Sequence, residues 1–167
     1  EEELVAAPAP DHVVLAQGAA EHAADRGEDA VAASVVVLVV ASTGNDGLPG
    51  VRYPAACPDA LSVAASDKAD APAAFTSYGP EVDLAAPGVD IYSTWHATGT
   101  GMAGYLARSG TSQAAAHVSG AASLVWAFRP DLGASQVATQ MTGTALDVGA
   151  PGWDKYTGWG RLDVGRA

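Results

Sequence analysis

Two stretches of the chain carry a continuous apolar pattern, and they differ in length and composition. Residues 35–41 are Val, Leu and Ala throughout, which is typical of a strand buried on both faces of a parallel sheet. Residues 112–128 are small or apolar almost throughout and leave no broad polar face, which is typical of a helix buried all round. The pattern therefore predicts a central strand and a central helix.

Shorter patterns predict the remaining elements. Residues 19–33 are Ala-rich, and their acidic residues would form a solvent-exposed face, which predicts a surface helix. The pattern at 134–141 predicts a short helix. Strands or strand pieces are predicted at 13–16, 60–65, 75–79, 82–85, 89–93 and 162–164. Turns or loops are predicted at 42–47, 86–88, 95–109 and 156–160. Helices, apolar strands and Gly-rich loops in this order indicate an α/β fold.

The length of 167 residues suits one domain with a substantial core. Residues 1–12 are acidic and then Pro-rich, so we expect a loose lead-in followed by one domain over 13–167. In α/β folds, functional groups gather beyond the carboxyl ends of the strands. The polar loop at 42–47, which follows the predicted central strand, is the first place to look for them.

The second place is the start of the central helix, where Gly110, Thr111 and Ser112 form a turn. Ser112 would lie among the unpaired N–H groups of the first helical turn, at the positive end of the helix dipole. A nucleophilic hydroxyl whose reaction develops negative charge suits this position. An ordinary Thr/Ser cap of a core helix suits it equally well, so both interpretations stay open at this point.

Composition narrows the function classes. The chain is 49% hydrophobic with only two Phe, so we expect a core of Ala and Val. A net charge of −11 argues against nucleic acids and anionic membranes as partners. Cys57 is the one cysteine, which excludes an intrachain disulfide and a cysteine zinc motif. No stretch approaches the ~20 apolar residues of a membrane span, and no signal-peptide pattern opens the chain.

A series of motifs resembles the C-terminal half of the catalytic domain of subtilisin-type serine proteases, the subtilases. Residues 110–120, Gly-Thr-Ser-Gln-Ala-Ala-Ala-His-Val-Ser-Gly, resemble the nucleophile motif of that family. The Gly-Asn-Asp-Gly at 44–47 resembles the loop that supplies its oxyanion-hole asparagine. Further matches follow in the family's order at Tyr53-Pro54-Ala55, 62–65, 75–80, 85–88 and 156–161. The likeness is specific over about residues 35–165.

The resemblance implies a fold and a set of roles. The fold would be the three-layer subtilisin-like architecture, with a mostly parallel sheet, a buried central helix and its N-terminal strands missing. Ser112 would be the nucleophile, and its N–H and the Asn45 amide would bind the oxyanion. Gly44, Gly110 and Thr111 would contact the substrate, a peptide or protein. No cofactor is implied, structural calcium has no residue-level match here, and the family resemblance implies secretion.

The chain lacks the family's motifs for the catalytic base. A serine nucleophile needs a base that is oriented by a carboxylate, and the family's Asp and His motifs are absent. His117 follows Ser112 by five residues, about 140° around a helix, so we expect it to point away as a hydrogen-bonded core residue. His96, in the predicted loop, is the histidine to consider as a replacement for the missing base. His12 has no context that places it, and His22 lies on the predicted surface helix.

Smaller departures affect the motif and the substrate strand. Gln113 and Ala116 replace the usual Met and Pro of the nucleophile motif, and residues 15–18 match the family's substrate strand poorly. A parallel sheet without its first strands should expose an apolar edge and one uncovered face. We therefore expect a partial domain that relies on a partner, the missing N-terminal half. The alternatives are a non-catalytic binding module and, less favoured, an acidic cation-binding domain.

Overall fold

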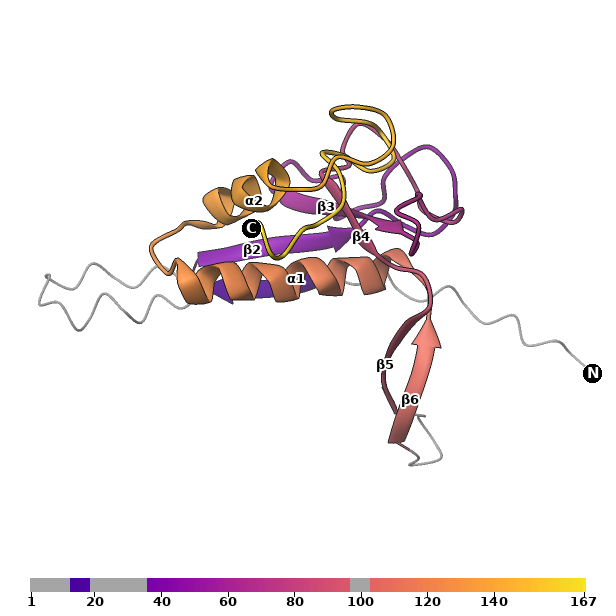
Figure 1. Ribbon diagram of the computed structural model, residues 1–167, viewed down its shortest axis with the longest axis horizontal. Helices are drawn as coiled ribbons and strands as arrows, with labels where there is room; N and C mark the ends of the chain where they lie inside the picture. The colour runs from indigo at the N-terminus through magenta and orange to yellow at the C-terminus, as the bar shows by residue number, and fades with distance from the viewer. Residues whose placement is uncertain (1–12, 19–35, 97–102) are drawn as a thin grey trace, which may run out of the picture.

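The computed structural model describes residues 13–18, 36–96 and 103–167. Its main sheet has the strand order β1-β2-β3-β4 (Figure 1). These strands are β1 (Val13–Gly18), β2 (Val36–Ser42), β3 (Ala60–Ser66) and β4 (Leu84–Pro87). β2, β3 and β4 run parallel, whereas β1 pairs with β2 antiparallel and forms one edge of the described sheet. The α/β class and the mostly parallel sheet are thus confirmed.

Two helices cover the same face of this sheet. The long helix α1 (Thr111–Phe128) packs across all four strands, and α2 (Ala134–Gly143) packs on α1 and β2 (Figure 1). Leu61, Val63 and Ala65 alternate along β3 and point to this face, because side chains two positions apart share a face of a strand. With Ala114, Val118 and Met141 among the helical partners, the core consists mainly of Ala and Val, as composition predicts.

The helix bounds follow from local chemistry. Gly110 precedes the first residue of α1, and the helix ends at Phe128, before Arg129 and Pro130. Pro130 disfavours helical backbone at the residue before it, which explains the stop. Trp126 is buried, and its Nε1–H donates to the Leu132 carbonyl oxygen over 2.8 Å, which ties the connection to α2 against the end of α1. Both helices lie where the sequence predicts them.

The opposite face of the sheet is covered only in part. Ala64 and Ala85 point to this side and pack with Val82 in a second, small cluster. Val37 and Val39 of β2 are only half-buried, so the central strand is not buried on both faces as predicted. The helix predicted at 19–33, which would supply the third layer, and the lead-in at 1–12 lie outside the described residues.

A second sheet contains two strands only. β5 (Ile91–His96) pairs antiparallel with β6 (Ala103–Arg108), and the ribbon projects from the body of the molecule (Figure 1). We call this ribbon the arm. The sequence predicts a loop over 95–109, which is wrong for β6: cross-strand pairing with β5 imposes extended structure on a segment with little strand propensity of its own.

Other differences from the predicted elements are local. Residues 75–79 are not a strand, because only Tyr78 forms an isolated bridge, to Pro49. β4 continues through Pro87, where a turn is predicted. Residues 162–164 form no strand, although the Leu162 N–H donates to the Ala85 carbonyl oxygen over 2.8 Å. These segments are ordered by single contacts to the sheet rather than by a ladder.

One carboxylate, that of Asp83, is partly buried at the amino end of β4. The Asp83 Oδ2 accepts a hydrogen bond from the Ser62 N–H at 2.7 Å. Burial raises the pKa of the Asp83 carboxyl, and the bond from Ser62 opposes that effect only in part. Asp83 therefore ties the starts of β3 and β4 together and does so with a carboxylate that is only partly compensated.

Candidate active site

Asn45 lies beyond the carboxyl end of β2, and two backbone hydrogen bonds to residues 75–77 hold its loop. The Ser77 N–H donates to the Gly44 carbonyl oxygen over 2.9 Å, and the Gly47 N–H donates to Phe75 over 2.7 Å. Gly44 has φ +107°, and a Cβ there would lie 2.6 Å from the Cγ of Arg52. The loop thus needs glycine at position 44. Its backbone is held in place by the hydrogen bonds to residues 75–77.

The turn at residues 110–112 is joined to the same edge of the sheet. The Gly110 N–H donates to the Gly88 carbonyl oxygen over 2.8 Å, and Gly88 in turn donates to Ser66 at the end of β3 over 2.9 Å. A Cβ on Gly88 would lie 2.9 Å from the Gly110 oxygen and 2.6 Å from the Cβ of Ala65. Sequence reasoning assigned no role to Gly88; its signal is the Ala-Pro-Gly run at 86–88, in which β4 ends.

The two halves of the site meet through Asn45 and Thr111. Asn45 Oδ1 accepts hydrogen bonds from the Thr111 N–H at 2.9 Å and the Thr111 hydroxyl at 3.0 Å, across 66 residues of sequence. Because a backbone N–H can only donate, the accepting atom of the Asn45 amide is its oxygen. The Asn45 Nδ2–H₂ group therefore remains available as a donor beside the helix start.

Ser112 is half-buried in the first turn of α1. The first four N–H groups of a helix have no partner within the helix. Asn45 takes up the N–H of Thr111, while the N–H of Ser112 forms no hydrogen bond with any other described residue. Two donors, the Ser112 N–H and the amide of Asn45, are thus held at the positive end of α1, where Ser112 lies, an arrangement that suits a developing oxyanion.

The residues predicted to contact the substrate differ in their hydrogen bonding. Thr111 is fully buried, and both its donors bind Asn45, so its place in the structure is to orient Asn45. Gly44 and Gly110 are also buried, one on each side of the Asn45–Thr111 link. Gln113 folds back over this turn, because a Cβ on Gly110 would lie 2.6 Å from its Oε1. Substrate contacts at Gly44 and Gly110 remain predictions.

Neither described histidine serves Ser112. His96 pairs with Ala103 at the far end of the arm, five positions from the Ile91–Arg108 pair at its base. At about 3.4 Å per residue, His96 lies ~17 Å further out along the ribbon than Arg108. His117 points away, as predicted, but it is exposed rather than in the core; its Nδ1 lies 2.9 Å from the Gln113 carbonyl oxygen. His12 and His22 lie outside the described residues.

No described carboxylate forms a hydrogen bond with Ser112 or with a described histidine. Asp83, the partly compensated acid, lies at the amino end of β4, whereas the Ser112 turn packs at Gly88 beyond the carboxyl end of that strand. No group of three or more His, Cys, Asp or Glu side chains in the described part of the chain could hold a metal ion. The described residues therefore place Ser112 and two N–H donors at the start of α1 and supply no base for Ser112.

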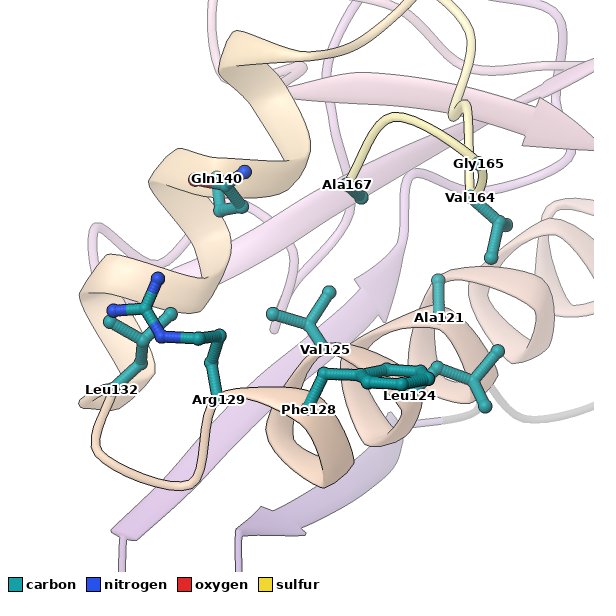
Figure 2. A pocket seen from close by; sticks show the side chains of 10 residues that line it. All are labelled: Ala121, Leu124, Val125, Phe128, Arg129, Leu132, Gln140, Val164, Gly165 and Ala167. Atoms are coloured by element: carbon teal, nitrogen blue, oxygen red, sulfur yellow. The ribbon is translucent and has the colours of Figure 1, made fainter.

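The α1 surface next to the site is not buried all round, contrary to the prediction. A stripe of side chains along α1 is exposed, and we call it the open stripe: Ala116, His117, Gly120, Ser123, Leu124, Ala127 and Phe128. At its far end, a cavity of about 320 Å³ opens between α1, α2 and the C-terminal residues, with Leu124 and Phe128 in its wall (Figure 2). This cavity lies along the C-terminal half of α1, away from Ser112.

Comparisons with known proteins identify relatives of this chain. The Subtilase family profile matches residues 10–160. A thermostable alkaline protease of Halalkalibacterium halodurans is 39% identical over 131 residues, which are 78% of this chain and 34% of that protein. Subtilisin DY of Bacillus licheniformis is 37% identical over 132 residues, 77% of this chain and 45% of that protein. The chain thus spans less than half the length of these relatives.

Solved structures show the same fold. A lanthipeptide protease superimposes with a TM-score of 0.68 at 26% identity, over 77% of this chain and 49% of that one. A psychrophilic subtilisin-like protease from Pseudoalteromonas sp. AS-11 gives a TM-score of 0.71 at 19% identity, over 78% and 63% of the two chains. The profile match, the relatives and the shared fold together show that this chain belongs to the subtilase family.

Proposed function

We propose that the chain is the nucleophile and oxyanion-hole half of a serine endopeptidase that cleaves peptide bonds through an acyl-enzyme. One observation carries the proposal: the double hydrogen bond from Thr111 to Asn45 Oδ1, which leaves the amide donor beside Ser112. A helix cap requires no such link to a loop 66 residues away. The membership of the subtilase family supports the same reaction.

In the proposed reaction, Ser112 Oγ attacks the scissile carbonyl carbon and its proton passes to a base. The carbonyl oxygen becomes an oxyanion that accepts hydrogen bonds from the Ser112 N–H and Asn45 Nδ2. The base then returns the proton to the leaving amine, and water hydrolyses the acyl-enzyme by the reverse sequence of steps. Because the described residues hold no base, we propose that the triad Asp and His come from an N-terminal half of such a domain.

The remaining properties follow from this proposal. The substrate is a peptide or protein, the chemistry uses protein groups alone, and neither nucleic acid nor membrane is a partner. By family resemblance we propose an extracellular location. Among the helices that the structure describes, none combines the length and apolarity needed to cross a bilayer. Structural calcium would be an addition to this proposal, and calorimetric titration with Ca²⁺ tests it.

A fluorophosphonate probe tests the nucleophile. We expect labelling of Ser112 when the chain is supplied with an N-terminal subtilase half, covalently or as a separate polypeptide, and loss of labelling in Ser112→Ala. Ser123→Ala is the matched control, because Ser123 is an exposed serine on the same helix, three turns from Ser112. Asn45→Ala should slow peptide hydrolysis by about 10²- to 10³-fold, the range known for loss of this donor in subtilisin. An unlabelled, folded Ser112 in the complemented protein would contradict the proposal.

A second function, a non-catalytic subtilase-like binding module, has its own supporting observation: no described side chain hydrogen-bonds the Ser112 hydroxyl as a base. Such a module would bind peptides without cleaving them. Peptide hydrolysis by the 167-residue chain on its own, abolished by Ser112→Ala, rules this function out.

A further inference from the structure

The arm carries large aromatic side chains that nothing in the described structure covers. Tyr92 is 71% exposed, Tyr105 is 65% exposed and Trp95 is 39% exposed. A two-stranded ribbon is marginal by itself in water, and each strand of the arm has one edge without a strand partner among the described residues. Exposed aromatic side chains beside open strand edges mark a surface that contacts an extended chain.

The two faces of the arm differ in chemistry. Tyr92 and Tyr105 stack on one face, with ring centroids 5.5 Å apart and planes at 18°. On the other face, the guanidinium carbon of Arg108 lies 4.0 Å from the centre of the Trp95 ring. Trp95 pairs with Gly104, and a Cβ on Gly104 would meet nothing within 4 Å, so the indole has open space beside it. One face is therefore aromatic, and the other presents a cation fixed on an indole.

Arg108 is an exposed cation in a chain of net charge −11. Arg52, Arg129 and Arg161 each form an ion pair with an aspartate, whereas Arg108 forms none with a described acid. Stacking engages the face of the guanidinium and leaves the N–H donors in its plane free. A guanidinium held in this way suits the bidentate binding of a carboxylate.

The position of this cation ties it to the reaction. β6 ends at Arg108, and Ser112 follows four residues later. The link between them is fixed, because Gly110 donates to Gly88 and the Ser109 hydroxyl accepts from the Asp90 N–H over 2.9 Å. An extended peptide whose scissile bond reaches Ser112 can therefore continue along the arm and bring a side chain to Arg108.

We propose that Arg108 and Trp95 form a subsite for an acidic side chain of an extended peptide, within a few residues of the bond presented to Ser112. This inference rests on the proposed function for the identity of the ligand as a peptide. The carboxylate binds the free N–H donors of Arg108, and Trp95 holds the guanidinium in place. The site selects Asp or Glu against their amides.

The test compares two fluorescent peptides that differ only in Asp-Glu against Asn-Gln, bound to the folded Ser112→Ala chain and followed by fluorescence anisotropy. The acidic peptide should bind about tenfold tighter, as a hydrogen bond to a charged group allows. Arg108→Gln should abolish the preference, whereas Arg166→Gln, the matched loss of an exposed arginine elsewhere, should keep it. Trp95→Phe should retain more of it than Trp95→Leu.

The outcomes separate this subsite from the proposed function. An acidic preference that persists in Arg108→Gln, that falls equally in Arg166→Gln, or that is missing in the Ser112→Ala chain overturns the subsite. A preference that depends on Arg108, together with no probe labelling of Ser112 in the complemented protein, keeps the subsite and overturns the peptidase.

Discussion

The two sides of helix α1 have nearly the same composition and opposite surroundings. The covered side packs Ala115, Val118 and Ala122 against the sheet, each with no exposed surface. The open stripe has Ala116, Gly120 and Ala127 among its members, and it carries Leu124 at 51% and Phe128 at 84% exposure. Small apolar residues alone therefore do not mark burial; the presence of a neighbouring element decides it.

Introducing a charged side chain should give the largest difference in stability between the two sides of α1. We expect Ala122→Asp to destabilise the chain by about 3 kcal/mol or more, because an unpaired carboxylate would be forced against the sheet. The matched change on the open stripe, Ala116→Asp, should cost only about 0.5 kcal/mol, the difference in helix propensity. Urea unfolding followed by circular dichroism measures both. Equal losses for the two variants would remove the distinction between the sides.

Deleting apolar atoms should give a smaller contrast of the same sign. Val118→Ala should cost about 2 kcal/mol, from two buried methyl-sized groups and the cavity they leave. Leu124→Ala removes more atoms but should cost less than about 0.5 kcal/mol, because Leu124 is largely in water already. The check is again chemical unfolding, at several protein concentrations. A large, concentration-dependent loss for Leu124→Ala would show that the open stripe is covered by another copy.

The smallest contrast concerns pH and two carboxylates, one covered and one open. Burial raises the pKa of Asp83 in the folded chain, so the folded state holds the proton more tightly and stability falls as pH rises from 3.8 through the raised pKa. Asp83→Asn keeps an acceptor for Ser62 and should remove this fall.

Asp131, just beyond the open stripe, should show the opposite sign. The hydrogen bond from Arg129 lowers its pKa, so the stability that it contributes is present at neutral pH and is lost as pH falls below 3.8. Asp131→Asn should remove that loss, which is small because the pair is exposed. Unfolding midpoints across a pH series measure both variants. The same slope for both would mean that burial does not set the sign.

The sequence predicts the parts of this structure that depend on local pattern and motif order. β2, β3, α1 and α2 lie where their patterns place them, and Asn45 is hydrogen-bonded to Thr111, the residue before Ser112. The open stripe could not be predicted, because both sides of α1 have small or apolar residues in the sequence. For the same reason His117, expected inside the core, lies in water.

The arm shows the other limit of sequence reasoning. Residues 103–108 contain glycine and alanine, and only their pairing with β5 makes them a strand. Without that register, nothing in the sequence places His96 at the tip or brings Arg108 onto Trp95. Non-local pairing is therefore the information that a pattern along the chain does not contain.

The bond between Thr111 and Asn45 also has a consequence for synthesis on the ribosome. Asn45 is made 66 residues before its anchor, which at 5–20 residues per second is an interval of about 3–13 s. During that interval the amide has no fixed direction, and the serine next to the anchor does not yet exist. The proposed oxyanion site therefore forms only after both segments have been made and have come together, so a nascent chain lacks the geometry of the proposed reaction until this part of the fold has formed.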